Sequence, residues 1–356
     1  LKPDLQPHAT DHIEDMIELI QKNIQNGRAY QAEGHVLFDV SSYLAYGKLS
    51  NRDKDEQMAG SRVKVASYKK NPGDFVLWKP STGTQPGWES PWGFGRPGWH
   101  LECSAMSEKT LGLPFDIHSG GADLIFPHHE NEIAQTCAAH NKTHDLKSFA
   151  KYWFHNGFVN VEGEKMSKSV GNIRLVNELN KEFKGEVLRL TLLSAHYRQP
   201  LNWTRNIIKQ NSTMLERFYR NLKDLENIDA YKDNDQIDDV VIEGLYDDLN
   251  TPKVIAALNV LSNQIGSADK KMKGKIKYNL LEVGKIIGIL QNSPDKWLGY
   301  GKSEKLDETT IERLIKERNE ARGNKNFEVA DEIRKELKEK GIEIEDTKKG
   351  TIWKSV

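Results

Sequence analysis

The chain has 356 residues, and its 51 Lys and Arg nearly balance its 52 Asp and Glu, which gives a formal charge of -1 at pH 7. This balance excludes nucleic-acid binding through bulk charge, so any such partner must contact local basic patches. Two cysteines, Cys103 and Cys137, are too few for a disulfide framework, and no apolar run approaches the roughly 18 residues of a membrane helix. We therefore expect a cytoplasmic protein of several units and no membrane segment.

The first residues predict an amphipathic helix. The chain opens at Leu1 without an initiator methionine, and residues 1–8 show no sign of a strand, so we expect part of a longer protein. Asp11 and Glu14 fit a capping box, and Gly27 is a stop signal, so the helix is expected between them. Its apolar face consists of Ile13, Met16, Ile17, Ile20 and Ile24.

The next segment has the pattern of an inserted α+β module. Short β-like runs occur at residues 36–40 and 75–78, and polar segments separate them. Residues 81–99 are rich in Gly, Pro and Trp, which predicts an irregular loop. The module is therefore expected to cover residues 28–85 approximately, with the loop after it.

Helices and strands then alternate. Helices are expected at residues 101–111 and 127–139, a short strand at 115–118 between them, and a further strand at 154–161. Such alternation favours a parallel α/β sheet. After Asn172 the pattern is helical, and polar interruptions suggest domain boundaries. The last segment predicts a charged helix pair followed by a β-like tail.

A short polar loop carries two lysines and two hydroxyls in the run Lys165-Met166-Ser167-Lys168-Ser169. An ammonium group in such a loop can offset charge on the phosphates of a bound nucleotide. Lysine and serine are also common in solvated loops, and the spacing alone does not separate the two interpretations.

A second group of residues has the chemistry of a metal site. His128 and Glu132 are four residues apart, so on a helix they share a face, and Cys103 could add a thiolate. This mixed set suits zinc at about 2.0 to 2.3 Å. Alternatively, Cys103 is a core residue and the other two form a surface pair. Cys137, in the helical register after Glu132, suits the core better than the metal.

These motifs resemble those of the cysteinyl-tRNA synthetase family, which belongs to the class I aminoacyl-tRNA synthetases. The run KMSKS matches the second signature of class I, and GWHLECSAM and HSGGADLIFPHHENEIAQ are similar to the zinc-binding segments of the family. The first signature, the HIGH tetrapeptide, does not occur in this chain. The resemblance therefore implies a chain that lacks the segment bearing HIGH.

The resemblance implies an α/β Rossmann-like class I catalytic domain, present as its second half, then an α-helical bundle and a small C-terminal anticodon-binding domain. The expected ranges are 1–172 for the catalytic remainder with its insertion and KMSKS loop, 173–300 for the linker and bundle, and 301–356 for the anticodon domain.

The resemblance also implies roles for particular residues. Cys103, His128 and Glu132 would be three of four zinc ligands, and the fourth would be a cysteine before the HIGH region. Lys168, with Lys165 in the same loop, would contact ATP. Trp99 would be an aromatic floor for the cysteine side chain, with His118 and Asp123 near the substrate and Gly120 and Gly121 close to the nucleotide. Alternatively, Trp99 anchors the Gly/Pro loop and Asp123 caps a helix.

The C-terminal segment resembles the anticodon-binding module of the family. Four residues are candidate contacts to unpaired bases: Arg322, Phe327, Asp331 and Asp346. In the alternative interpretation, Phe327 joins Ala330, Ile333 and Leu337 on the buried face of a helical hairpin. The family more often has tryptophan at the position of Phe327, so both interpretations stay open.

The implied activity is that of a cysteine-tRNA ligase. The carboxylate of L-cysteine attacks ATP to give cysteinyl-adenylate, and tRNA(Cys) then accepts the cysteinyl group. The implied cofactors are one Zn²⁺ per chain and ATP with Mg²⁺, and the expected oligomeric state is a monomer. Two alternatives are a cysteine ligase that uses an amino-sugar acceptor and a tRNA-binding fragment without activity.

Overall fold

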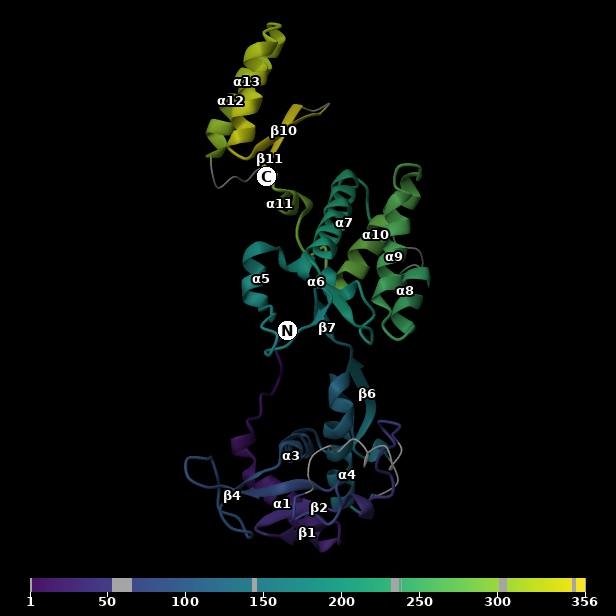
Figure 1. The fold of residues 1–356 in the computed structure, drawn as a ribbon. Coiled ribbons are helices and arrows are strands. Elements are labelled where there is room, and N and C mark those ends of the chain that lie inside the picture. Colours follow the sequence, from purple (N-terminus) through teal and green to yellow (C-terminus); the bar gives the residue numbers. More distant parts are fainter. Residues whose placement is uncertain are drawn as a thin grey trace. The chain divides into compact units, whose positions relative to one another are not determined.

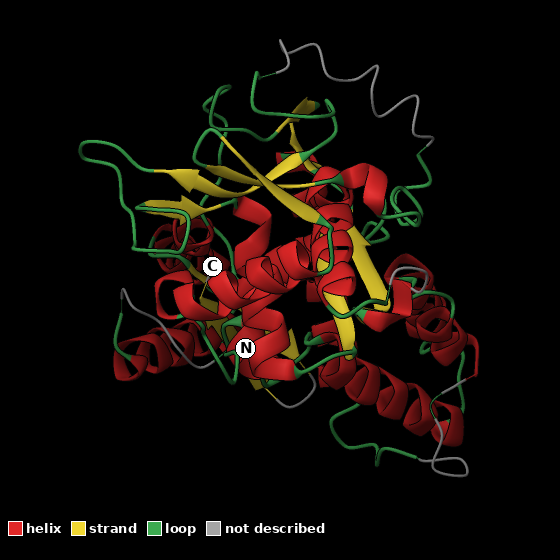
Figure 2. Ribbon diagram, turned by 90° about the horizontal axis from the view of Figure 1, so that it is seen from below, coloured by secondary structure: helices red, strands yellow, loops and turns green. Residues whose placement is uncertain are grey.

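A computed structural model describes residues 2–52, 66–142, 146–231, 237, 239–300, 306–347 and 350–355. The chain divides into two compact units, Leu1–Gly157 and Phe158–Val356. Figure 1 labels many of their elements. Helices supply most of the regular structure, and the strands form small separate sheets (Figure 2). The expected boundaries at residues 172 and 300 stay predictions.

The inserted module contains an antiparallel sheet of four strands. The order follows the chain: β1 (Ala29–Ala32), β2 (His35–Phe38), β3 (Phe75–Pro80) and β4 (Gly95–Pro97). The two predicted β-like runs correspond to β2 and β3, whereas β4 lies in the segment that was predicted to be irregular. Gly95 is required there because a Cβ would collide with Trp78 and with the carbonyl of Lys79. Residues 53–65 of the predicted insertion lie outside the described residues.

Three helices of the first unit pack against one another: α1 (Ile13–Gln25), α3 (Trp99–Leu111) and α4 (Glu130–Ala139). Their apolar faces share one core with the four-stranded sheet. The predicted capping box at the start of α1 was wrong. Asp11 ends a 3₁₀ turn, Ala9–Asp11, and His12 is the N-cap. The Nδ1 atom of His12 lies 2.8 Å from the carboxylate of Asp15, a contact that sequence spacing did not reveal.

The predicted parallel pairing is present in the first unit, where β5 (Phe115–Gly121) pairs with β6 (Ala150–Asn156). The single strand predicted at residues 154–161 was wrong. The chain instead forms β6 and then β7 (Val159–Val161), and these two strands belong to different sheets. Gly157 separates them and is the last residue of the first unit.

The second unit is mainly helical and contains a sheet in which β7 pairs with β8 (Glu164–Lys165) and with β9 (Leu201–Trp203). Seven helices precede the C-terminal module in the described residues: α5 (Val176–Glu182), α6 (Gly185–Leu193), α7 (Arg205–Asp224), α8 (Asp239–Tyr246), α9 (Thr251–Asn263), α10 (Lys270–Ile287) and α11 (Pro294–Leu298). Their apolar faces form a core that includes Leu215, Phe218 and Leu258. Among all the residues that the structure describes, no helix combines the length and apolar character needed to cross a bilayer.

The C-terminal module consists of a helix pair and a β-hairpin. Helices α12 (Glu308–Gly323) and α13 (Phe327–Glu339) lie side by side (Figure 1), and β10 (Ile342–Thr347) pairs antiparallel with β11 (Gly350–Ser355). A small core that includes Ile311, Leu337 and Trp353 joins them. The charged helix pair and β-like tail predicted from the sequence are therefore both present.

Candidate functional site

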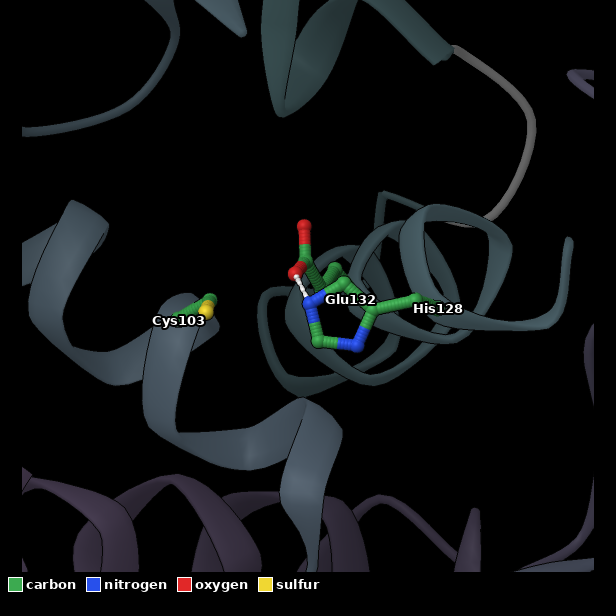
Figure 3. A group of neighbouring side chains, drawn as sticks. All are labelled: Cys103, His128 and Glu132. Atoms are coloured by element: carbon green, nitrogen blue, oxygen red, sulfur yellow. Dashed lines mark ion pairs between the residues drawn. The ribbon is translucent and has the colours of Figure 1, made fainter. Parts of the chain in front are cut away.

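Cys103, His128 and Glu132 lie together in the first unit. One ligand atom of each residue lies within 4.8 Å of the others. Cys103 is on α3, Glu132 is on α4, and His128 is in the π-helical turn Ile125–His129 that leads into α4. Figure 3 shows the imidazole of His128 against the carboxylate of Glu132, with Cys103 on the neighbouring helix. The fold thus brings Cys103 close to two residues that lie 25 and 29 positions further along the chain.

Glu132 is the central group of this cluster and is 0% exposed. Its two carboxylate oxygens lie 2.6 Å from Nε2 of His128 and 2.8 Å from Nε2 of His118. These approaches have ion-pair distances but lack the alignment of regular hydrogen bonds. Burial alone would raise the pKa of Glu132, but the two imidazoles outweigh burial and hold this pKa at about 2. The buried carboxylate is therefore ionised, and a metal ligand must be ionised to bind.

The surroundings of Cys103 favour the protonated form of its thiol, whereas those of Glu132 favour the ionised carboxylate. Burial raises its pKa to about 12, and the carboxylates of Glu132 and Glu102 add to the rise. Without a cation, the thiol therefore keeps its proton at neutral pH. Binding of a metal ion would offset the negative charge of Glu132 and displace that proton. The donor set of one thiol, one imidazole and one carboxylate fits zinc.

Two aromatic side chains flank the cluster. The ring of Trp99 lies 4.4 Å from the ring of His128, and Trp99 is 59% exposed, so much of its side chain is open to solvent. Nδ1 of His100 lies 2.8 Å from Nδ1 of His128, and burial lowers the pKa of His100 to about 4. At neutral pH His100 is thus uncharged, as a neighbour of a bound cation should be.

His118 and His129 form a second group with the same carboxylate. One ligand atom each of His118, His129 and Glu132 lies within 4.8 Å of the others. Burial lowers the pKa of His129 to about 4, and its Nδ1 lies 2.8 Å from Nε2 of His155. Glu132 therefore belongs to two candidate ligand sets, one with Cys103 and one without it.

Asp123 lies outside this cluster. It is exposed in the 3₁₀ turn Ala122–Leu124, and its carboxylate folds back against Gly121. A Cβ at Gly120 would collide with the ring of His129. The two glycines thus make room for protein side chains, which adds a second reason for glycine beside the predicted approach to a nucleotide.

The KMSKS run forms a closed loop in the second unit. The Asn172 side chain accepts a hydrogen bond from the Ser167 amide at 2.9 Å and donates one to the Lys165 carbonyl at 3.2 Å. Gly171 has a φ of 73°, a left-handed conformation that favours glycine. The ammonium of Lys165 lies 4.1 Å from the centre of the Phe158 ring, and Lys168 is exposed. Asn172 holds the loop closed and leaves Lys168 open to solvent.

The predicted base contacts in the C-terminal module have unequal surroundings. Phe327 is 61% exposed, so the alternative that placed it on the buried face of the hairpin was wrong. Asp331 is also exposed. Asp346 instead accepts two hydrogen bonds from Arg318, each of 2.9 Å, and another from Arg322. Asp346 therefore fixes two arginines on α12.

Replacing Asp346 by alanine is expected to destabilise this module by about 1 to 2 kcal/mol. The buried guanidinium of Arg318 would lose its ion-pair partner, and the effect is moderate because Asp346 itself is partly exposed to solvent. The hydrogen bond from Arg318 holds the pKa of Asp346 below its ordinary value, although burial opposes this. The stabilisation is therefore present above a pH of about 4 and is lost as the pH falls through the lowered pKa. Thermal unfolding should show a difference in Tm at pH 7 that shrinks in acid. Replacing the exposed Glu332 by alanine is the control, and an equal loss there would contradict this role.

Sequence reasoning missed several residues of both sites. His100, His129 and His155 surround the cluster, and Asn172 closes the loop. The position of His129 directly after His128 was a signal for His129, but no local pattern indicated His155. Its position on β6 becomes relevant only when β6 pairs with β5.

Comparisons with known proteins match most of the chain. Residues 1–213 match the profile of the tRNA synthetases class I (C) catalytic domain, and residues 308–353 match that of the cysteinyl-tRNA ligase anticodon binding domain. The cysteine–tRNA ligase of Parvibaculum lavamentivorans is 51% identical over 356 residues, which cover 99% of this chain and 75% of the relative. That of Maricaulis maris is 48% identical over 358 residues, covering 99% and 76%. The chain thus spans about three quarters of the length of these relatives.

Solved structures share the fold at low sequence identity. A putative arginyl-tRNA synthetase from Campylobacter jejuni has a TM-score of 0.51 and 12% identity, and the match covers 81% of this chain and 64% of that one. The Mycobacterium tuberculosis methionyl-tRNA synthetase bound by methionyl-adenylate has a TM-score of 0.50 and 16% identity, covering 83% and 76%. At such identities the likeness concerns the fold alone.

Proposed function

The chain belongs to the cysteine–tRNA ligase family of class I synthetases, and we propose that Cys103, His128 and Glu132 hold the zinc ion with which it selects cysteine. The activity of the family is ATP-dependent charging of tRNA with cysteine. The anticodon-binding profile at residues 308–353 favours tRNA as acceptor, and neither the amino-sugar alternative nor the fragment alternative finds support. A monomeric state and a cytoplasmic location stay predictions.

The single observation that carries the zinc proposal is the buried carboxylate of Glu132 within 4.8 Å of both a thiol and an imidazole donor. A bound zinc ion would accept the substrate thiol as thiolate, and a serine hydroxyl gives up its proton far less readily. The protein supplies the rest of the selection by holding its donors in place. The second group, with His118 and His129, provides imidazoles beside the same carboxylate and orients it.

We place the side chain of the substrate cysteine against Trp99. Its ring lies next to His128 and its side chain is largely exposed, which suits contact with a small apolar side chain. His118 would stay near the substrate through its contact with Glu132. Asp123, which is exposed and outside the cluster, could bind the substrate ammonium group.

On the nucleotide side, Lys168 is proposed to contact the phosphates of ATP, with Mg²⁺ as counterion. Its exposed ammonium on a loop closed by Asn172 suits a group that moves onto a polyphosphate. Lys165 would contribute positive charge from the base of the loop. Such catalysis depends on positioning and charge stabilisation and needs no covalent nucleophile.

For the tRNA, we propose that Phe327 stacks on an unpaired base, and that Arg322 and Asp331 form hydrogen bonds to bases. The exposure of Phe327 supports stacking. Asp346 would act mainly by orienting Arg322, from which it accepts a hydrogen bond.

The proposal is tested by zinc content and by cysteine-dependent exchange of pyrophosphate into ATP. Both are measured on the 356-residue chain and on a form extended to the length of its relatives. We expect one zinc per chain, and exchange that needs cysteine in at least one form. Absence of zinc from both forms would overturn the metal assignment while leaving the family membership intact.

Replacing Trp99 by alanine is expected to raise KM for cysteine by about 10-fold, because contact between an aromatic ring and a small substrate side chain contributes on the order of 1 to 2 kcal/mol. The value of kcat and the zinc content should change little, since Trp99 supplies no ligand. Steady-state exchange at varied cysteine measures the effect, and Trp99→Phe is the conservative control. An unchanged KM for cysteine in Trp99→Ala would remove Trp99 from the binding site.

A further inference from the structure

Gln135 joins the two helices that carry the proposed ligands. It lies on α4 and is fully buried. Its side-chain Nε2 donates one hydrogen bond of 2.7 Å to the carbonyl of His100 and another of 2.7 Å to Oγ of Ser104, both on α3. A single amide group thus uses both of its protons to connect α4 to one turn of α3.

The chemistry of these partners fixes the orientation of the amide. A backbone carbonyl can only accept, so the nitrogen of Gln135 must face His100, and a flipped amide would place two acceptors together. Ser104 accepts from Gln135 and is thereby free to donate to the backbone carbonyl of Glu132, which lies 3.3 Å from its Oγ. The polar chain therefore runs from Gln135 through Ser104 to the ligand-bearing residue Glu132.

The hydrogen bonds of Gln135 and Ser104 lie next to two of the proposed metal ligands, Cys103 and Glu132. His100 and Ser104 lie on either side of Cys103 on α3, and Glu132 precedes Gln135 by about one turn on α4. The hydrogen bonds thus join the turn that carries the thiol to the turn that carries the carboxylate. A slip of one residue along a helix is a shift of about 1.5 Å, whereas metal ligands must be held within roughly 0.5 Å of their working positions.

We propose that Gln135 is a positioning residue for the metal site, which sets the register of α3 against α4 so that Cys103 and Glu132 can bind the same ion. This inference rests on the zinc proposal above. Gln135 does not touch the ion, and it acts through the backbone of His100 and the hydroxyl of Ser104. Partners of ligand residues typically contribute 10- to 100-fold to metal affinity.

If Gln135 had a purely structural role, its replacement would change different measured quantities. An ordinary buried glutamine would affect the stability of the metal-free protein but not the affinity of its folded form for zinc. The backbone carbonyl of Gln135 also accepts a hydrogen bond of 2.9 Å from Asn23 on α1, and this bond survives any change of the side chain. Loss of the amide therefore tests the contact with α3 alone.

The experiment compares Gln135→Met, which keeps the length and approximate volume, with Ser104→Ala and with Thr136→Val. Thr136 is buried on the same helix, and its hydroxyl makes no hydrogen bond within the described residues, so Thr136→Val is a matched control. Zinc Kd is measured by competition with a chromophoric chelator, and cobalt substitution reports the thiolate ligand by its absorption spectrum. Thermal unfolding of the metal-free proteins measures stability separately.

We expect the zinc Kd to rise about 10- to 100-fold in Gln135→Met, less in Ser104→Ala, and not at all in Thr136→Val. The thiolate-to-cobalt absorption should weaken or shift only in the first two. Wild-type affinity and spectrum in Gln135→Met would overturn the inference, even if its stability fell. If Gln135→Met does not fold, Ser104→Ala decides by the same criteria. A wild-type protein that binds no zinc would instead overturn the zinc proposal itself, and this inference with it.

Discussion

Replacing Cys103 by alanine is expected to abolish stoichiometric zinc binding and to lower kcat/KM for cysteine by about 1000-fold. In the 356-residue chain, loss of the thiolate leaves His128 and Glu132 as the ligands from this cluster, and two ligands hold zinc poorly. The substrate thiol then has no metal ion to bind as thiolate. A metal contact that supplies several kcal/mol corresponds to a factor of this size, since about 1.4 kcal/mol is tenfold.

Cys137→Ala is the matched control for this prediction. Cys137 is the other cysteine of the chain and is 2% exposed within the core formed with α1 and α3. Removing its sulfur should cost about 1 kcal/mol of stability and leave the zinc content at one per chain. Metal analysis and cysteine-dependent exchange on both variants give the comparison. One zinc per chain in Cys103→Ala, or loss of zinc in Cys137→Ala, would contradict the ligand assignment.

The elements of regular structure were predicted best where the pattern was local. Helix α1 follows the spacing of Ile13, Met16 and Ile20, all of which are buried. The strand predicted at residues 154–161 failed because apolar continuity does not show that Gly157 lies between two sheets. Strand β4 was missed because Gly95 and Pro97 argue against a strand, and only pairing with β3 creates one.

In the candidate site too, spacing predicted contacts between residues close in sequence, but not contacts between distant segments. His128 and Glu132 are four residues apart, so their contact followed from helical spacing. Cys103 lies on another helix, and it was assigned by family resemblance, because no local rule joins α3 to α4. His155 and Gln135 were missed for this reason, since both act through contacts with partners 26 or more residues away.

Replacing Lys168 by alanine is expected to lower cysteine-dependent pyrophosphate exchange by about 100- to 1000-fold without changing the zinc content. A positively charged group aimed at the charge that develops on a polyphosphate contributes roughly 3 to 4 kcal/mol in a water-excluded site. The loop should keep its shape, because the bonds of Asn172 to Ser167 and Lys165 do not involve the Lys168 side chain. The change therefore removes a charge rather than a structure.

Two comparisons separate this role from a general loss of positive charge. Lys181→Ala removes an exposed lysine from α5 in the same unit and should leave exchange within about twofold of wild type, as surface substitutions usually do. Lys168→Arg keeps the charge but changes the geometry of its donors, so it should recover only part of the rate. The rate is measured in whichever form of the chain shows exchange. If Lys168→Ala and Lys181→Ala lose activity equally, or if neither does, the loop has no special contact with the phosphates. A loss confined to Lys168→Ala, with zinc content and thermal unfolding equal to those of wild type, places the nucleotide on this loop.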